Sequence, residues 1–133
     1  MGTTLIIKGA DFSNNRLPKE LEINNLVDGT LTSGGINEST TRLACTDYFE
    51  YKEDINLNIN LELYKWNIIF YNSEKKSISG SFPSLWIEDS NSINDALLLP
   101  DSNPVYFRIG FGRKDNEELT VAEGTDKFSL LYY

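Results

Sequence analysis

Residues 54–64 read Asp-Ile-Asn-Leu-Asn-Ile-Asn-Leu-Glu-Leu-Tyr. The odd positions from Ile55 to Leu63 are all apolar, and the even positions from Asn56 to Tyr64 carry asparagine, glutamate and tyrosine. Because a β-strand sends successive side chains to opposite faces, this pattern predicts one apolar and one solvated face. A helix would distribute the same residues around its whole circumference. The stretch therefore predicts a strand over residues 54–64 whose odd-numbered residues build a core.

A second alternating run covers residues 105–113. Its odd-numbered residues are apolar from Val105 to Phe111, and its even-numbered residues are Tyr106, Arg108, Gly110 and Gly112. The same period of two predicts a strand, with Arg108 on its solvated face. Glycines on that face would leave room for another group to approach the backbone closely.

Further strand candidates recur roughly every 8 to 15 residues, with turn-forming Asn, Asp, Ser and Gly between them. They are residues 5–8, 21–27, 42–51, 66–71, 76–79, 85–88, 119–121 and 127–133. Short strands at this spacing predict an all-β fold, and we expect an antiparallel β-sandwich of the jelly-roll, galactose-binding-like type. We also expect a helical turn over 94–98 and a long loop over 28–41. The apolar ends of the chain predict that a strand near each end pairs in one sheet.

The chain has 133 residues and a formal net charge of −8. This length fits a single β-sandwich domain, residues 1–133, with its own core. Phosphate backbones and anionic membranes need a cationic surface, so nucleic acid and membrane are not expected partners. No stretch approaches the ~20 apolar residues of a membrane span, and the first residues lack the features of a signal peptide. We therefore expect a protein made in the cytosol that leaves it only as part of an assembly.

Histidine is absent, and Cys45 is the single cysteine. This composition excludes Ser-His-Asp and Cys-His catalysis, histidine-ligated zinc and an internal disulfide. Cys45 lies in a predicted strand, which favours a buried thiol. Residues 89–94 lack the glycine of an EF-hand loop, which excludes that type of calcium site. No cofactor is expected. A structural calcium site of another type, built from Asp28, Asp89 or backbone carbonyls, stays open.

Paired carboxylates are the catalytic arrangement that this composition still allows, because two of them can hydrolyse a glycosidic bond. The candidates are Asp47, Glu50, Glu88 and Asp89. Nothing in their spacing brings two of them together across a cleft, and solvated surface acids account for them better. A small glycosidase is therefore the third alternative, and we expect no enzyme.

A sugar-binding surface needs an aromatic face and groups that hydrogen-bond to hydroxyls. The candidate ligand-binding residues are Trp66, Trp86, Tyr106 and Arg108. The competing interpretation is that both tryptophans belong to the core and that Arg108 pairs with a neighbouring acid.

Three segments taken in order resemble one family. Residues 39–49, Ser-Thr-Thr-Arg-Leu-Ala-Cys-Thr-Asp-Tyr-Phe, resemble the S-x-x-R-x-x-T-D-Y-(I/F) opening of carbohydrate-binding-like jelly-roll modules of phage tail and head fibres and related virion proteins. Residues 66–80 and 106–116 are similar to later motifs of these modules, and residues 5–13 to the lead strand of modules from gut Bacteroidetes and their phages. The motif positions fall on Arg42, Thr46, Asp47, Tyr71 and Arg108. The resemblance implies a largely structural role for these residues.

The resemblance, the missing secretion signal and the missing catalytic groups together favour a non-catalytic virion protein of a tailed phage. Such a protein would decorate a capsid or form part of a head or tail fibre. It would assemble in the host cytoplasm as a homo- or hetero-oligomer with other virion proteins, with host-surface glycans as a further partner. The alternative is a stand-alone bacterial glycan-binding module.

Overall fold

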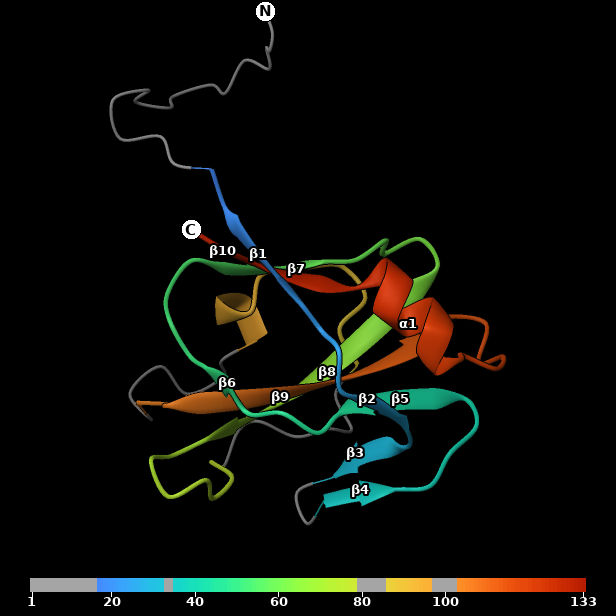
Figure 1. The fold of residues 1–133 in the computed structure, drawn as a ribbon, viewed down its shortest axis with the longest axis horizontal. Helices are drawn as coiled ribbons and strands as arrows, with labels where there is room; N and C mark the ends of the chain where they lie inside the picture. Colours follow the sequence, from blue (N-terminus) through green and yellow to red (C-terminus); the bar gives the residue numbers. More distant parts are fainter. Residues whose placement is uncertain (1–16, 33–34, 79–85, 97–102) are drawn as a thin grey trace, which may run out of the picture.

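The computed structural model describes residues 17–32, 35–78, 86–96 and 103–133. Every pair of strands in it is antiparallel, so the expected all-β class is confirmed, with one short α-helix added (Figure 1). The elements are β1 (Lys19–Glu22), β2 (Leu26–Asp28), β3 (Thr30–Thr32), β4 (Gly35–Asn37), β5 (Arg42–Cys45), β6 (Phe49–Glu50), β7 (Ile55–Asn58), β8 (Tyr64–Tyr71), the 3-10 turn η1 (Asn94–Ala96), β9 (Tyr106–Arg113), α1 (Val121–Lys127) and β10 (Ser129–Tyr132).

Strand β9 is the centre of a five-stranded sheet. It pairs with β8 along its whole length, from Tyr64 opposite Arg113 to Tyr71 opposite Tyr106. On its other edge it pairs with β5 and then with β6, and β2 extends the sheet beyond β5. This sheet contains the expected strands 66–71 and 105–113. The expected strand 42–51 is interrupted between β5 and β6.

A three-stranded sheet has the order β1-β10-β7. Lys19 lies opposite Tyr132 and Tyr132 lies opposite Ile55, so the C-terminal strand is the middle one. Pairing between strands near the two ends is thus found for residues 19–22, whereas the expected strand 5–8 lies outside the described residues. The expected strand 21–27 is two strands, β1 and β2, one in each sheet.

The main core lies between these two sheets. It joins Ile55 and Leu57 of β7 and Leu130 of β10 to the apolar face of β9, and all of these side chains are fully buried. The rings of Phe111 and Phe128 stack in it with their centroids 4.0 Å apart. Burying each such side chain stabilises the fold by about 1.5–3 kcal/mol.

The strand predicted over residues 54–64 is wrong in its second half, because β7 ends at Asn58. The side-chain oxygen of Asn60 accepts from the backbone N–H of Glu62, and its backbone carbonyl accepts from Leu63 and Tyr64. This turn reverses the chain into β8. Leu63, predicted in the core, is 51% exposed, and Tyr64, predicted on the wet face, is buried.

The second face of the five-stranded sheet is covered as well, which corrects two predictions. The hairpin β3–β4 falls within the expected loop 28–41 and packs Leu31 against Ala44, Ile69 and Tyr71. Arg108, expected on a solvated face, is only 8% exposed. Side chains of the chain itself occupy the space above two glycines of β9, namely Asn67 at Gly110 and Arg42 at Gly112.

Helix α1 replaces the strand predicted over 119–121. Thr120 caps it by accepting from the backbone N–H of Glu123 at 3.1 Å. Gly124 packs directly onto Leu43 and Leu26. Two other predicted strands, 76–79 and 85–88, are represented by single bridges at Ser77 and Ile87. Within the described ranges, no helix is long and apolar enough to cross a membrane.

Candidate ligand-binding site

Three tyrosines and an arginine gather at one end of the second face of the five-stranded sheet. The ring of Tyr48 meets Tyr71 edge-on at 4.8 Å between centroids and meets Tyr106 at 6.3 Å. Tyr71 and Tyr106 are opposite one another on β8 and β9, and Tyr48 comes from the segment between β5 and β6. Together with Arg108 these residues are called the tyrosine cluster.

Arg108 is held by aromatic rings and a hydroxyl. Its Nε donates to the hydroxyl of Tyr71 at 2.9 Å, and its guanidinium carbon lies 4.6 Å from the ring centre of Tyr48. Burial raises the pKa of Tyr71, and the guanidinium opposes that rise. Among the described residues the ion pairs involve Arg113 and Lys127. No carboxylate of the described residues pairs with Arg108 as the competing interpretation expected, and cation–π contacts surround its guanidinium instead.

A hollow of about 530 Å³ opens beside the cluster. We call it the Tyr48 hollow, and its lining residues are Leu21, Glu22, Asn24, Asn25, Thr46, Asp47, Tyr48, Phe49 and Lys75. Asn25 donates to the carboxylate of Asp47 at 2.7 Å. The ammonium of Lys75 lies 4.9 Å from the ring centre of Tyr48. A second hollow of about 380 Å³ adjoins it and shares Leu21, Tyr48 and Phe49.

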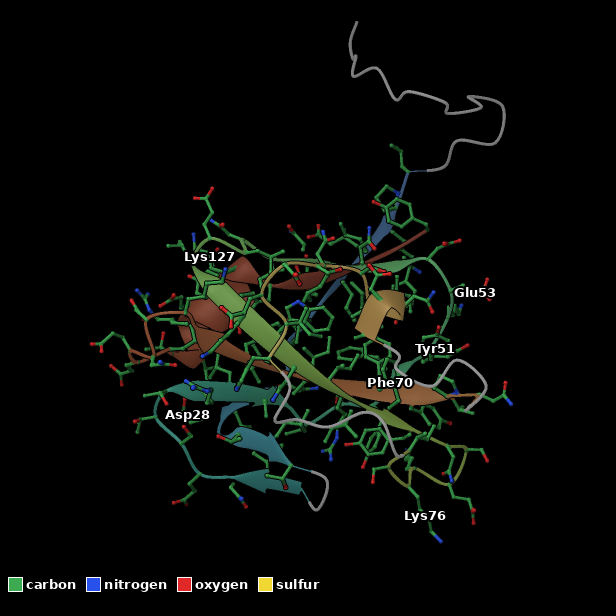
Figure 2. All side chains as sticks on the ribbon, turned by 180° about the vertical axis from the view of Figure 1, so that it is seen from behind. Asp28, Tyr51, Glu53, Phe70, Lys76 and Lys127 are labelled. Carbon is green, nitrogen blue, oxygen red and sulfur yellow. The ribbon has the colours of Figure 1, made fainter. Side chains whose placement is uncertain are left out.

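Local turns place the charged groups of this hollow. Lys75 has a φ of 61° and closes a turn in which the side-chain oxygen of Asn72 accepts from the backbone N–H groups of Glu74 and Lys76. The left-handed conformation at Lys75 directs the chain back from β8. Lys76, the next residue, lies at the opposite end of the molecule from Asp28 and Lys127 (Figure 2).

The two tryptophans predicted in a sugar site lie elsewhere. Trp66 is fully buried in the main core and donates from its indole nitrogen to the carbonyl of Ser90 at 2.8 Å. Trp86 is half-buried and contacts Arg42 and Lys65, whose cationic groups lie 4.9 and 5.1 Å from its ring centre. Of the four predicted residues, the structure brings together Tyr106 and Arg108 and separates both tryptophans from them.

Sequence reasoning did not choose Tyr48, Asn25 or Lys75 as site residues. A signal was present, because Tyr48 directly follows the motif positions Thr46 and Asp47. Those two residues line the hollow, and the motif positions Tyr71 and Arg108 belong to the adjoining cluster. Only Arg42 lies apart, at Trp86.

The hollow presents an aromatic ring, a carboxylate, amides and an ammonium to solvent. Such groups hydrogen-bond to hydroxyl-rich ligands and stack on their apolar faces. The thiol of Cys45 takes no part, because it is fully buried and burial raises its pKa to about 11.

No set of three or more Asp, Glu or Cys side chains in the described parts of the chain could hold a metal ion. Of the carboxylates considered for catalysis, Asp47 is engaged with Asn25. Comparisons with protein-family models, with curated proteins and with solved structures found no match.

Proposed function

We propose that the protein is a non-catalytic virion protein of a tailed phage, a component of capsid decoration or of a head or tail fibre. In this proposal it has a carbohydrate-binding-like jelly-roll β-sandwich fold, mediates assembly with other virion proteins, and contacts host-surface glycans. Two antiparallel sheets packed over one core support the fold assignment. The sequence motifs of residues 39–49, 66–80 and 106–116 support the virion role.

One observation carries the glycan contact, and it is the Tyr48 hollow. Tyr48 offers a ring for stacking, Asp47 and Asn25 offer an acceptor and a donor for sugar hydroxyls, and Lys75 adds a cation. Four of the five motif positions lie in or beside this hollow, where the structural role that the resemblance implies would hold its lining in place. Tyr106 and Arg108 support the ring of Tyr48 from the side of the sheet.

The assembly contact is proposed for strand β1. This strand pairs with β10 along one edge, and all four of its side chains are exposed. An open edge offers unpaired backbone groups to a strand of another chain. Its three charged residues limit such pairing to a partner with complementary charges.

Glycan binding is tested on an array of host cell-surface polysaccharides, with wild-type protein beside the variants Tyr48→Ala, Asp47→Asn and Lys75→Met. We expect each variant to bind at least about tenfold more weakly, which corresponds to about 1.4 kcal/mol. Tyr133→Ala is the matched control, because Tyr133 is exposed elsewhere and should leave binding unchanged. Wild-type protein that binds no glycan on the array would remove the glycan contact from the proposal.

The virion role needs its own experiment. An antiserum against the purified protein should label purified phage particles in immunogold electron microscopy. Particles that carry no label, together with retained glycan binding, would favour the stand-alone bacterial glycan-binding module.

A further inference from the structure

Two cations and a tryptophan form a second cluster on the same face of the five-stranded sheet. In the strand register, Arg42 of β5 and Lys65 of β8 both lie opposite Gly112 of β9. Ile87 pairs with Trp66, which brings the neighbouring Trp86 to this part of the sheet. We call Arg42, Lys65, Trp86 and Asn116 the Trp86 cluster.

The two cations converge on a single oxygen atom. The side-chain oxygen of Asn116 accepts from Nη2 of Arg42 at 3.1 Å and from Nζ of Lys65 at 2.9 Å. The two nitrogens are therefore at most about 6 Å apart, a separation at which like charges repel each other appreciably near a protein surface. Asn116 has a φ of 61°, so a left-handed turn after β9 holds this oxygen in place.

Within the described parts of the chain, no carboxylate forms an ion pair with these cations. The ion pairs among the described residues involve Arg113 and Lys127, and neither Arg42 nor Lys65 forms one. Glu88 follows Ile87 in the chain, yet its contact with the described residues is made by its backbone carbonyl, which accepts from Lys114. Two neighbouring cations without a carboxylate partner among the described residues are unexpected in a chain with 20 acidic and 12 basic residues. Lys65 is also only 9% exposed, so solvent screens its charge poorly.

The backbone at Gly112 allows this arrangement. A Cβ at this position would lie 3.0 Å from Cδ and 3.2 Å from Nε of Arg42, so the arginine stem lies flat across the strand. Contact with the ring of Trp86 offsets part of the repulsion between the cations. The cluster thus holds two charged donors in fixed positions before any ligand arrives.

We propose that the Trp86 cluster binds an oxyanion, a carboxylate, sulfate or phosphate group. The guanidinium of Arg42 and the ammonium of Lys65 supply the charge. The side-chain amide nitrogen of Asn116, which donates no hydrogen bond to the described residues, supplies a neutral donor. Charge-assisted bonds from two cations suit such a group.

This site is separate from the Tyr48 hollow. Gly112 and Tyr106 are six residues apart on β9, which corresponds to about 20 Å along a strand. Oxyanion binding can therefore fail while the glycan contact stands, and the reverse is equally possible.

The test is a titration followed by NMR of the two indole N–H groups, with Trp86→Phe used to assign them. Sodium sulfate, sodium phosphate and sodium glucuronate are the probes, and sodium chloride at matched ionic strength is the reference. We expect the Trp86 signal to shift and saturate with an oxyanion, while the Trp66 signal moves little. Saturation by glucuronate alone identifies an acidic sugar as the ligand of the cluster. Saturation by all three probes shows that the cluster recognises the oxyanion group whatever molecule carries it.

Variants separate binding from a merely structural cation–π contact. Lys65→Met and Arg42→Met should each weaken binding at least tenfold, and Arg42→Lys should retain part of it. Lys127→Met is the matched control, because Lys127 is an exposed cation outside the cluster. The proposal is overturned if sulfate and chloride shift the wild-type signal equally, or if the Lys65→Met protein, with its other signals unchanged, titrates like the wild type.

Discussion

The hydroxyl of Tyr64 donates to Oε2 of Glu123 at 2.5 Å, which joins the first residue of β8 to helix α1. Nη1 of Arg113 lies 3.4 Å from the same carboxylate oxygen. Burial, with added contributions from the Glu123 carboxylate, raises the pKa of Tyr64 to about 12. The contact therefore requires a neutral tyrosine.

Alkaline pH should weaken the fold through this residue. In the unfolded chain a tyrosine loses its proton near pH 10, and in the folded protein Tyr64 keeps it until about pH 12. Its contribution to stability is thus complete below pH 10 and is lost as the pH rises through 12. Urea unfolding followed by circular dichroism at pH 8, 9.5 and 11 should give falling midpoints. Tyr64→Phe should reduce this slope without abolishing it, because burial also raises the pKa values of Tyr132, Cys45, Tyr71 and Tyr51. An unchanged slope in Tyr64→Phe would contradict the assignment.

Gly124 should not tolerate a side chain. In an exposed helix, alanine in place of glycine stabilises by about 1 kcal/mol. Here a Cβ would collide with Leu43 and would lie 2.9 Å from Cδ1 of Leu26, both in the core. We expect Gly124→Ala to lower the free energy of unfolding by about 1–3 kcal/mol. Thr125→Ala, at the next and exposed position, is the control and should be nearly neutral. Equal midpoints for both variants would show that the helix shifts away from β5.

Removing one hydroxyl should loosen the tyrosine cluster. Tyr71→Phe leaves the ring contacts of Arg108 in place but removes the acceptor of its Nε. Hydrogen bonds to charged groups contribute about 1.5–3 kcal/mol, so the free energy of unfolding should fall by that amount. Tyr132→Phe removes a longer bond to a backbone carbonyl, 3.2 Å from Glu50, and should cost about 0.5–1.5 kcal/mol. Chemical denaturation of the two variants compares them, and a larger loss in Tyr132→Phe would argue against a buried role for the Arg108 bond.

Cys45 should resist thiol reagents while the protein is folded. The reagents attack the thiolate, and burial raises the pKa of this thiol to about 11, so about one molecule in a thousand is ionised at pH 8. We expect no reaction with Ellman's reagent at pH 8 and one thiol per chain after addition of 8 M urea. Rapid labelling without urea would mean that β5 opens readily.

Strand periodicity predicted the centre of the fold well. The runs 66–71 and 105–113 match β8 and β9 to within two residues, because a short, largely apolar run and a strict apolar–polar alternation are both typical of strands. The same rule failed at Asn60, where a side-chain hydrogen bond to the backbone of Glu62 makes a turn within an alternating sequence. Helix α1 was missed because it has only seven residues, although Thr120 and Glu123 have the spacing of a helix cap.

The candidate site was predictable only in part. Alternation placed Tyr106 and Arg108 on one face of β9, and the structure keeps them there. It could not show that the β3–β4 hairpin covers this face, because long-range packing has no local sequence signal. For the same reason the sequence leaves Trp66 open as either a ligand-binding or a core residue, and the structure buries it in the main core.

Strand β10 lies between β1 and β7, which do not pair with each other. The three-stranded sheet therefore cannot assemble until residue 132 has been synthesised. Until then β7 lacks its pairing with β10 and is joined to residues 91–93 through the bridge between Asn56 and Ser92, and the core stays open on the side of β10. Strand β8 likewise cannot pair with β9 until residues more than thirty positions further along the chain have been synthesised. Folding of this chain is thus governed by contacts between distant segments, which slow it relative to helical proteins of the same length. During synthesis, the residues of β8 are therefore exposed until β9 follows, an interval in which unpaired strand edges can aggregate.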